Sequence, residues 1–333
     1  MGMSKLGQAL TAREIFKLVE ADLRRVEEKM GLESISSVDA VTAINRHLQQ
    51  SGGKRLRPTL VLLACQLFGE PSEAAVAMAA VVEMVHTATL VHDDVIDEAK
   101  TRRSQPSANV LFGNQTSVLA GDWLYMQAFQ IALRSRNFRV LDLLIGLTQL
   151  MVEGELLQLE RLGRLEISEA DYMELLDRKT ASLFSVCARL GAMAGGAGEA
   201  DEAKLGEFAW NLGIAFQLVD DVLDFTSREK VLGKPVGNDL REGKVTLPLI
   251  YALEDATPAE RQQVETVLRE RSYESVSFAT ILGIVMRYRG VERAMERATI
   301  FTDRARVLLH QFPDSPYQRA LLSVTDLVTS RDH

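Results

Sequence analysis

Residues 151–159 read Met151-Val152-Glu153-Gly154-Glu155-Leu156-Leu157-Gln158-Leu159, and they set the pattern for the middle of the chain. Their apolar side chains recur at intervals of three and four, which is the period of one face of an α-helix. Proline, which interrupts helices, is absent between residues 107 and 234. This part of the chain is therefore predicted to form long helices. Turn-forming residues predict breaks at 52–53, 68–72, 103–108, 162–164, 195–198, 233–243 and 256–258.

The remaining sequence has the same helical character. Two segments carry the signature of a helix start, in which a hydroxyl residue is followed by acids: Pro71-Ser72-Glu73 and Ser168-Glu169-Ala170-Asp171. We find no run of alternating apolar and polar residues that would indicate a strand, and no linker rich in Ser and Pro. The sequence therefore predicts a single all-α domain over residues 1–333.

Composition limits the possible classes of function. An apolar content of 47% suffices for a sizeable core, and a net charge of -8 argues against a nucleic-acid partner. Cys65 and Cys187 lie in apolar helical sequence without metal-ligand spacing, so we expect reduced, buried thiols. The apolar stretches 60–67 and 74–82 are shorter than the roughly 20 residues of a membrane span, and residues 1–20 do not form a secretory signal. We therefore expect a cytoplasmic protein without a transmembrane helix.

One acidic cluster occurs twice, as Asp93-Asp94-Val95-Ile96-Asp97 and as Asp220-Asp221-Val222-Leu223-Asp224. On a helix, the first and last carboxylates of each cluster lie one turn apart on the same face. Both clusters stand in apolar sequence, where carboxylates are not expected without partners. Two like charges 4 Å apart repel by about 4 kcal/mol near a protein surface, so a cation should meet them. Ligands that offer only oxygen select a hard ion, and Mg²⁺ is the first candidate because it also bridges to phosphates. A solvated helix face is the alternative, and the repetition of the cluster weighs against it.

Basic groups accompany the acidic clusters. Three cations and two glycines share a predicted helix start in Gly52-Gly53-Lys54-Arg55-Leu56-Arg57-Pro58, where backbone N–H groups can also bind a phosphate. Taken alone, such a run is usually surface charge. Further candidates are Arg102-Arg103 after the first cluster, Lys179-Thr180 between the clusters, and Lys234 and Lys244 on a Gly-rich loop. The inventory suggests two polyanionic groups, one held through metal and one held directly by Arg and Lys.

With these motifs in this order and spacing, the sequence resembles the trans-isoprenyl diphosphate synthases, or polyprenyl synthetases, over nearly its whole length. The motifs that carry the resemblance lie at 52–58, 92–97 with 102–103, 179–180, 213–224 and 233–248. The resemblance implies a large bundle of α-helices around a central catalytic cavity, usually in a homodimer. It also implies Mg²⁺-dependent condensation of isopentenyl diphosphate, head to tail, onto an allylic diphosphate.

The resemblance implies roles for individual residues on the allylic side. Three Mg²⁺ ions would bind that diphosphate, and the metal and nearby cations would stabilise it as the allylic C–O bond ionises. Asp94 points about 100° away from Asp93 on a helix, so it would act through a neighbour. The metal ligands would be Asp93, Asp97, Asp220 and Asp224, with Asp221 in support, and the cations would be Arg102, Lys179, Lys234 and Lys244. Thr180 and Gln217 would point oxygen atoms at the carbocation.

The second substrate would be held without metal. By the resemblance, isopentenyl diphosphate would bind to Lys54, Arg57, His86 and Arg103. Its double bond would attack the carbocation, and the departed diphosphate would remove the proton, so no protein base is required. From its residues alone, the favoured interpretation of His86 is a core histidine bonded to a carbonyl group. We expect His92 to be structural. Asp122 could cap a helix, support the site or take part in catalysis.

The resemblance also bears on product length. In this family the residue five positions before the first aspartate commonly limits growth when it is bulky, and here it is Ala88, followed by Thr89. A groove past small side chains along about 20 residues of helix is about 30 Å deep, which suits roughly seven to nine isoprene units. The sequence looks most like octaprenyl and related long-chain synthases that use farnesyl diphosphate. Met126 and Phe129 are candidates for the floor of the groove, with ordinary core packing as the alternative.

Other interpretations remain. A short- or medium-chain synthase for farnesyl or geranylgeranyl diphosphate would differ only in groove depth. A non-catalytic partner subunit would typically lose an acidic cluster, and a terpene cyclase would not be expected to keep Lys54, Arg57 and Arg103. A purely structural helical scaffold would explain none of the paired motifs. The sequence leaves open whether the membrane-soluble prenyl tail passes to a quinone or to another lipid, and whether the chain pairs with itself or with a smaller subunit.

Overall fold

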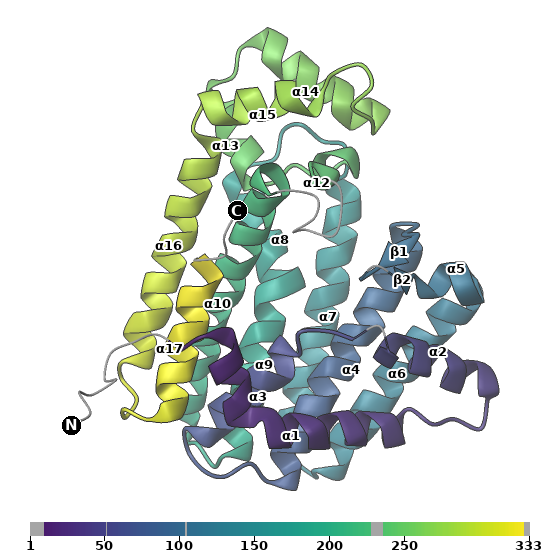
Figure 1. Cartoon of the computed structure of the whole chain (residues 1–333), viewed down its shortest axis with the longest axis vertical. Coiled ribbons are helices and arrows are strands. Elements are labelled where there is room, and N and C mark those ends of the chain that lie inside the picture. Colours follow the sequence, from purple (N-terminus) through teal and green to yellow (C-terminus); the bar gives the residue numbers. More distant parts are fainter. Residues whose placement is uncertain (1–9, 51, 104, 228–235, 330–333) are drawn as a thin grey trace. The chain divides into compact units, whose positions relative to one another are not determined.

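A computed structural model describes residues 10–50, 52–103, 105–227 and 236–329. Apart from two strands of two residues each, every regular element in these ranges is a helix, which confirms the all-α prediction (Figure 1). The elements are α1 (Ala12–Glu33), α2 (Asp39–Gln50), α3 (Leu56–Gln66), α4 (Glu73–Ile96), β1 (Thr101–Arg102), β2 (Gln105–Pro106), α5 (Ala108–Phe112), α6 (Asn114–Arg134), α7 (Phe138–Arg161), α8 (Glu169–Leu176), η1 (Asp177–Ala181), α9 (Ser182–Ala194), α10 (Glu199–Thr226), α12 (Asn238–Arg241), α13 (Leu247–Asp255), α14 (Pro258–Glu270), α15 (Phe278–Arg287), α16 (Gly290–Leu309) and α17 (Pro316–Thr329).

The chain divides into two compact units. Unit 1 comprises Met1–Thr148, Phe184–Glu207 and Leu308–Val324. Unit 2 comprises Gln149–Leu183, Phe208–Val307 and Thr325–His333. The single domain over residues 1–333 stays a prediction.

The central helix of unit 1 is α4. It is apolar almost all round and has buried residues on every face, as expected of a helix enclosed by others. α6 packs along it, and α1 and α3 contact it as well (Figure 1). By length and composition α4 could cross a membrane, contrary to the expectation from the sequence, but 67% of its apolar window is buried inside the protein. That burial is typical of a core helix. The thiols of Cys65 and Cys187 are free and buried, as predicted.

Two glycines allow helices of unit 1 to approach closely. A Cβ atom at Gly121 on α6 would lie 2.2 Å from His92 Nε2 on α4, and one at Gly191 on α9 would lie 2.2 Å from the Val61 carbonyl oxygen on α3. His92 Nε2 contacts the Val118 carbonyl oxygen at 3.0 Å and Asp122 Oδ1 at 3.4 Å. His92 therefore joins α4 to α6, as its predicted structural role requires. Asp122 lies inside α6 and caps no helix.

The predicted helix starts are confirmed. α4 begins at Glu73 after its N-cap residue Ser72. At the start of α8, the Asp171 amide donates to Ser168 Oγ at 3.1 Å, and the Ser168 amide donates to the Asp171 carboxylate at 3.2 Å. This reciprocal pair satisfies two donors that the first turn of a helix leaves open. α14 begins in the same way at Pro258, with Thr257 as its N-cap residue, inside the predicted break at 256–258.

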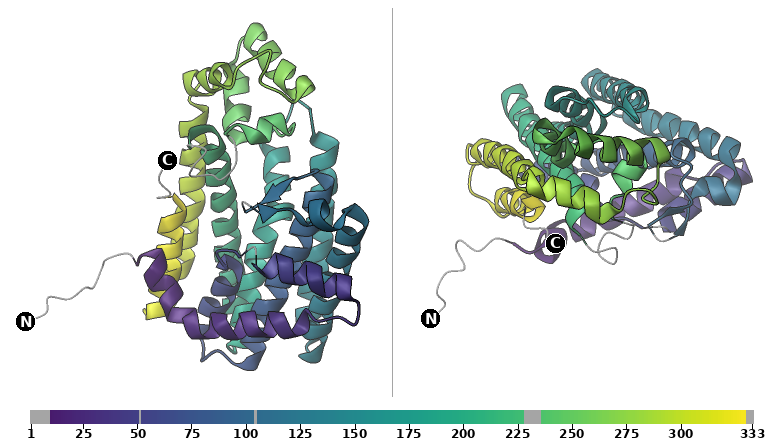
Figure 2. Two further views of the ribbon diagram at one scale, coloured as in Figure 1. Left: turned by 45° about the vertical axis from the view of Figure 1, so that its right-hand side comes forward. Right: turned by 90° about the horizontal axis from the view of Figure 1, so that it is seen from above.

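Two local features have no signal in the sequence. β1 and β2 form a small antiparallel hairpin in unit 1, which lies beside α5 (Figure 2). In unit 2, the segment Asp177–Ala181 winds as a π-helix, a wide turn that often occurs at functional sites. It contains Lys179 and Thr180, which the sequence places on a regular helix.

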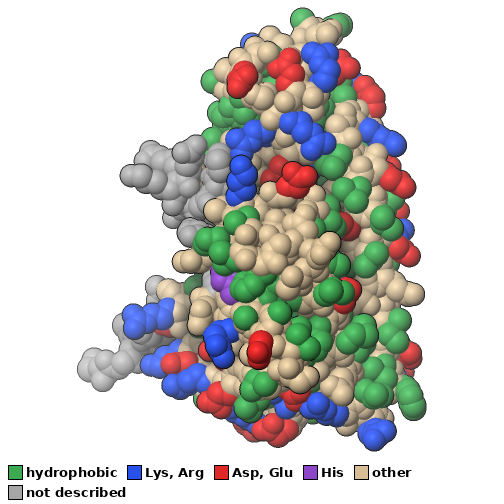
Figure 3. All heavy atoms as spheres, turned by 90° about the vertical axis from the view of Figure 1, so that its right-hand side faces the viewer, with side chains coloured by type: hydrophobic (Ala, Val, Ile, Leu, Met, Phe, Trp, Pro, Cys, Tyr) green, Lys and Arg blue, Asp and Glu red, His purple; other side chains and the backbone are tan. Residues whose placement is uncertain are grey.

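Unit 1 exposes an apolar stripe, which consists of Leu119, Met126 and Leu133 on α6 and Phe138 and Ile145 on α7. The members of each helix recur every seven residues, and Leu119, Met126 and Phe138 are 67%, 63% and 79% exposed. Figure 3 shows hydrophobic side chains gathered on the lower right of the face that it presents, with few charged ones among them. Contiguous apolar surface of this kind usually marks an interaction site.

Candidate active site

The first acidic cluster lies at the C-terminal end of α4, in unit 1. α4 ends at Ile96, and the amide of its C-cap residue Asp97 donates to the Asp93 carbonyl oxygen at 2.8 Å. Asp93 is half-buried and Asp97 is exposed. The last turn contains no basic residue, and the C-terminus of a helix is the negative pole of its dipole. A cation at this position would therefore offset both the carboxylate charges and the helix dipole.

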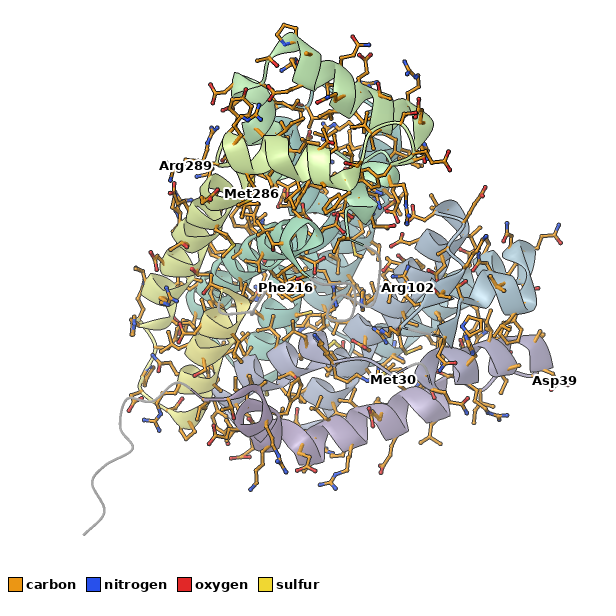
Figure 4. All side chains as sticks on the ribbon, turned by 45° about the horizontal axis from the view of Figure 1, so that its top comes forward. Met30, Asp39, Arg102, Phe216, Met286 and Arg289 are labelled. Carbon is orange, nitrogen blue, oxygen red and sulfur yellow. The ribbon has the colours of Figure 1, made fainter. Side chains whose placement is uncertain are left out.

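Asp94 points into unit 1, where it is 2% exposed. Arg102 on β1, labelled in Figure 4, donates to Asp94 Oδ1 through Nε at 2.8 Å and through Nη2 at 2.5 Å. Burial raises the pKa of Asp94, and the guanidinium of Arg102 opposes that change. Asp94 thus holds Arg102 in place. The catalytic role of both residues stays a prediction.

Three cations of unit 1 come from the loop before α3, the first turn of α3 and the turn after β1: Lys54, Arg57 and Arg103. A Cβ atom at Gly53 would lie 2.6 Å from Arg103 Nη1, so the loop before α3 touches the residue after β1. Arg57, in the first turn of α3, contacts His86 Nε2 on α4 at 3.0 Å. Within the described ranges, no carboxylate lies within 4.0 Å of any of the three cations. We call them the cation cluster. The buried carboxylate of Glu83, which pairs with Arg55 at 2.8 Å, offsets part of this positive charge. Cations that lack a direct ion pair of their own favour an anionic ligand.

His86 is neutral in this environment. Burial lowers the pKa of His86 well below its ordinary value, and Arg57 and Arg103 lower it further. Because a guanidinium can only donate, His86 Nε2 accepts from Arg57 and the ring proton resides on Nδ1. The partner at Nε2 is therefore the guanidinium and not a carbonyl group, which favours the substrate-site interpretation of His86 over the core-histidine interpretation.

The second acidic cluster lies on α10 and borders a cavity of about 220 Å³ within unit 2. The cavity walls come from α7, α8, η1, α10 and the segment 239–246. The predicted residues on these walls are Lys179, Thr180, Gln217, Asp220, Asp221 and Lys244. The structure thus brings these six residues together from three separate segments of the sequence.

The two lysines of this cavity are held by acidic residues. Lys179 Nζ donates to Glu155 Oε2 at 2.5 Å and to Gln158 Oε1 at 3.0 Å, and both partners lie on α7. Lys244 Nζ donates to Glu242 Oε2 at 2.7 Å. These contacts fix the positions of the ammonium groups on the cavity wall, in contrast to the cation cluster of unit 1.

Asp221 is 4% exposed and accepts two hydrogen bonds. Tyr172 Oη donates to its Oδ2 at 2.5 Å, and Gln217 Nε2 donates to its Oδ1 at 2.8 Å. Thr180 Oγ1 in turn donates to Gln217 Oε1 at 3.2 Å. Burial raises the pKa of Asp221 well above its ordinary value, and the charge of Asp239 adds to this effect. Burial also raises the pKa of Tyr172, so that its hydroxyl stays protonated.

Asp224 differs from the other acids of its cluster because it is 0% exposed. Its carboxylate accepts the backbone amides of Asn238 at 3.3 Å and Asp239 at 3.2 Å, at the start of α12. This geometry anchors the segment around α12 and does not support an open metal ligand, so the metal-binding role of Asp224 stays a prediction. Lys234 lies outside the described residues.

Three residues of the unit 2 site are missed by the sequence. Asp239 lines the cavity beside Asp220 and Asp221, and the available signal is an acid in the same Gly-rich loop as Lys244. Tyr172 and Glu155 also belong to the site through their bonds to Asp221 and Lys179. Neither has a local signal, since both stand in ordinary amphipathic helical sequence.

The residues predicted to limit product length lie on α4 and α6 in unit 1. Ala88 is 0% exposed, and the hydroxyl of Thr89 donates to the His86 carbonyl oxygen at 2.7 Å. Met126 belongs to the apolar stripe, and together with Phe129 it lines a hollow on the surface of α6 and α7. This surface position does not support a floor role for Met126 and Phe129, which stays a prediction.

The donor chemistry of the acidic clusters fits Mg²⁺. Asp93 and Asp97 in unit 1, and Asp220 and Asp239 in unit 2, offer hard oxygen donors of the type that this ion prefers. Among the residues that the structure describes, no group of three or more acidic, histidine or cysteine side chains is already arranged as a metal site. However, Mg²⁺ commonly binds through one or two carboxylates, with water and substrate phosphates as its other ligands. Each cluster offers that number.

Known proteins resemble the chain over most of its length. Residues 38–285 match the family model described as polyprenyl synthetase. The octaprenyl diphosphate synthase of Haemophilus influenzae is 36% identical over 320 residues, which cover 96% of this chain and 97% of the relative. The geranylgeranyl diphosphate synthase of Sulfolobus acidocaldarius is 39% identical over 249 residues, which cover 73% of this chain and 76% of the relative.

A solved structure agrees with these relatives. The crystal structure of polyprenyl synthase from Caulobacter crescentus, complexed with calcium and isoprenyl diphosphate, has a TM-score of 0.92 and 34% identity, with 97% of this chain and 99% of that chain covered. The all-α architecture, the two acidic clusters and the match of family and structure lead to the same assignment: the chain belongs to the polyprenyl synthetase family of prenyltransferases.

Proposed function

We propose that the protein is a long-chain trans-polyprenyl diphosphate synthase. It would condense isopentenyl diphosphate, head to tail, onto farnesyl diphosphate and release a heptaprenyl to nonaprenyl diphosphate. The observation that carries the proposal is the cation cluster, because cations without carboxylate partners suit a diphosphate that binds without metal. The near-full-length similarity to an octaprenyl diphosphate synthase supports the long product.

In this proposal, unit 1 holds isopentenyl diphosphate. Lys54, Arg57 and Arg103 bind its phosphate oxygens, and neutral His86 orients Arg57 by accepting from Nη1. Asp94 holds Arg102 through two hydrogen bonds, so that the guanidinium is ready for a phosphate without first being ordered. Preorganised donors of this kind contribute to catalysis because they need no rearrangement during the reaction.

Unit 2 holds the allylic diphosphate through Lys179 and Lys244. Glu155 and Gln158 keep the ammonium group of Lys179 at the cavity wall. Thr180 and Gln217 line the same cavity and turn oxygen atoms toward each other and toward the space where an allylic carbocation would form. The departing diphosphate takes the proton, so the chain needs no general base.

Members of the family depend on Mg²⁺ in general. For this chain we propose Asp93, Asp97 and Asp220 as ligands and three ions in all. The bound metal would stabilise the negative charge that develops on the leaving diphosphate. The buried Asp94 and Asp221 then act by holding Arg102 and Gln217.

Product size tests the proposed function directly. Purified protein incubated with farnesyl diphosphate, labelled isopentenyl diphosphate and Mg²⁺ is expected to form products of heptaprenyl to nonaprenyl length, because the residue at position 88 is small. Thin-layer chromatography of the dephosphorylated products measures their length. Accumulation of geranylgeranyl diphosphate alone would contradict the long product and support the short-chain alternative. No condensation at all would instead support a non-catalytic partner subunit.

The short-chain alternative has a specific observation in its favour, which is the 39% identity to a geranylgeranyl diphosphate synthase. That similarity covers 73% of the chain, whereas the octaprenyl relative covers 96%. The non-catalytic alternative is weaker since both acidic clusters are intact. We propose the cytoplasm as the location of the enzyme and a membrane lipid as the fate of its product.

We also propose that the apolar stripe of unit 1 is the contact between two copies of the chain. Heptad spacing on α6 and α7 is the pattern by which helices pack against other helices. A symmetric dimer would bury the same stripe of both copies against each other. This arrangement would cover side chains that are about half to four-fifths exposed in the single chain.

Charge substitutions in the stripe test the dimer. The double variant Leu119→Arg/Met126→Arg is expected to sediment as a monomer, whereas the parent protein sediments as a dimer in analytical ultracentrifugation. Leu32→Arg is the matched control, because Leu32 is 73% exposed but lies on α1, outside the stripe. A double variant that keeps the sedimentation coefficient of the parent dimer would exclude the stripe as the contact.

A further inference from the structure

We propose that Tyr172 is a positioning residue for prenyl transfer. Through Asp221 it sets the orientation of the Gln217 side chain, so that Gln217 and Thr180 present oxygen atoms to the cavity of unit 2. The inference rests on the proposed function. It adds Tyr172, on α8, to the residues that the sequence predicts for the reaction.

The first link joins Tyr172 to Asp221. Both side chains are 4% exposed, and the phenol donates to Asp221 Oδ2 at 2.5 Å. A carboxylate buried to this degree requires donors on its oxygens, since each unsatisfied oxygen loses its hydration without compensation. Tyr172 supplies the donor for one oxygen, and Gln217 supplies the donor for the other.

The second link sets the amide of Gln217. An amide has a donor end and an acceptor end. Both oxygen atoms of Asp221 accept in this structure, one from Tyr172 and one from Gln217. Gln217 thus turns Nε2 toward Asp221, at 2.8 Å, and Oε1 toward Thr180, at 3.2 Å. The hydroxyl proton of Thr180 is then engaged by Gln217 Oε1. The lone pairs of Thr180 Oγ1 and the second lone pair of Gln217 Oε1 remain for other contacts.

The direction of this chain of hydrogen bonds matters for the reaction. A cavity that stabilises positive charge on carbon needs oxygen lone pairs and not N–H groups on its wall. If the Gln217 amide were reversed, Nε2 would face Thr180 and the positive ends of its N–H dipoles would oppose the carbocation. Asp221 prevents this reversal, and Tyr172 keeps Asp221 in the position that does so.

Removal of the phenol hydroxyl tests the first link. Tyr172→Phe is expected to lower kcat on the order of tenfold, which corresponds to about 1.4 kcal/mol of transition-state stabilisation. KM for both diphosphates should stay within about twofold, because uniform substrate binding is unaffected when only a transition-state contact is lost. Tyr251→Phe is the matched control. Tyr251 is a buried tyrosine of the same unit whose hydroxyl donates to the Glu169 carboxylate at 2.9 Å, so its loss should leave kcat unchanged.

A donor–acceptor exchange tests the second link without changing Tyr172. Asp221→Asn introduces an amide that can donate to Gln217 Oε1 and so turn Nε2 toward Thr180, which should lower kcat. Adding Gln217→Glu restores an acceptor toward Thr180 at the same total charge, and most of the lost kcat should return. Thermal denaturation of each variant confirms that the fold is kept.

The outcomes are distinct. Parent kcat in folded Tyr172→Phe, or a double variant as slow as Asp221→Asn alone, would overturn the positioning role while leaving the proposed function in place. Failure of the parent protein to form any prenyl product would overturn the proposed function itself. Loss of kcat in Tyr172→Phe together with recovery in the exchange variant would establish the role.

Discussion

Asp97→Asn is expected to lower kcat by about 100- to 1,000-fold, the range seen when one preorganised charge contact to a transition state is removed. The same substitution should not destabilise unit 1. Asp97 is exposed at the C-terminal end of α4, where a negative charge opposes the helix dipole. Its neutralisation is expected to stabilise the helix by about 0.3–1 kcal/mol. Loss of activity with equal or greater stability would indicate that Asp97 serves to bind a ligand and not to stabilise the fold.

The measurements are steady-state kinetics over a Mg²⁺ titration and thermal unfolding monitored by circular dichroism. Asp39→Asn is the matched control, because Asp39 is an exposed acid in the first turn of α2, where the helix dipole favours negative charge. We expect this variant to lose a little stability and to keep full activity. If Asp97→Asn retained more than about a tenth of kcat at saturating Mg²⁺, the contribution of Asp97 to kcat would be too small for a metal ligand.

Ala88→Phe is expected to shorten the product to geranylgeranyl diphosphate or less while the first condensation continues. Ala88 is 0% exposed on the helix that ends in the first acidic cluster, so an aromatic ring there must displace neighbouring side chains or fill space along α4. Overpacking of this kind costs typically about 1–3 kcal/mol. Chromatography of the dephosphorylated products gives the length distribution, and thermal unfolding gives the loss of stability.

A substitution at a second buried alanine of α4 distinguishes a specific effect on product length from the general effect of overpacking. Ala79 is also 0% exposed, and nine residues along a helix place it on the side opposite Ala88. Ala79→Phe should destabilise unit 1 to a similar extent without changing the product. Equal product lengths for both variants would remove Ala88 from the path of the prenyl chain.

The helices could be predicted because their signals are local. Apolar periodicity, the absence of proline and the hydroxyl residues at positions 72 and 168 each act within a few residues, and the structure places helix starts accordingly. The π-helical turn at Asp177–Ala181 could not be predicted in this way. Its partners come from distant sequence: Trp210 Nε1 donates to Asp177 Oδ1 at 2.5 Å, and a Cβ atom at Gly154 would lie 3.1 Å from the Lys179 amide nitrogen.

The types of residue in the site could be predicted from the sequence, but the residues that hold them in place could not. Charged residues in apolar sequence, such as Asp220, stand out along the chain. The groups that hold them do not, and Glu155 and Tyr172 appear only when α7, α8 and α10 are folded together. Asp224 stays a predicted ligand by its place in a repeated motif, whereas only the fold shows that its carboxylate also accepts the backbone amides of Asn238 and Asp239.

The enclosure of α4 restricts how this enzyme could evolve a different product. The helix that carries Ala88 is also the helix around which unit 1 packs, with α6 along its length. A mutation that alters the space beside the growing chain therefore alters the stability of the unit at the same time. A single substitution that greatly changes the side-chain volume on α4 would destabilise the protein and be selected against. New product lengths are therefore accessible mainly through small changes in volume, or through paired substitutions on α4 and α6 that keep the total volume constant.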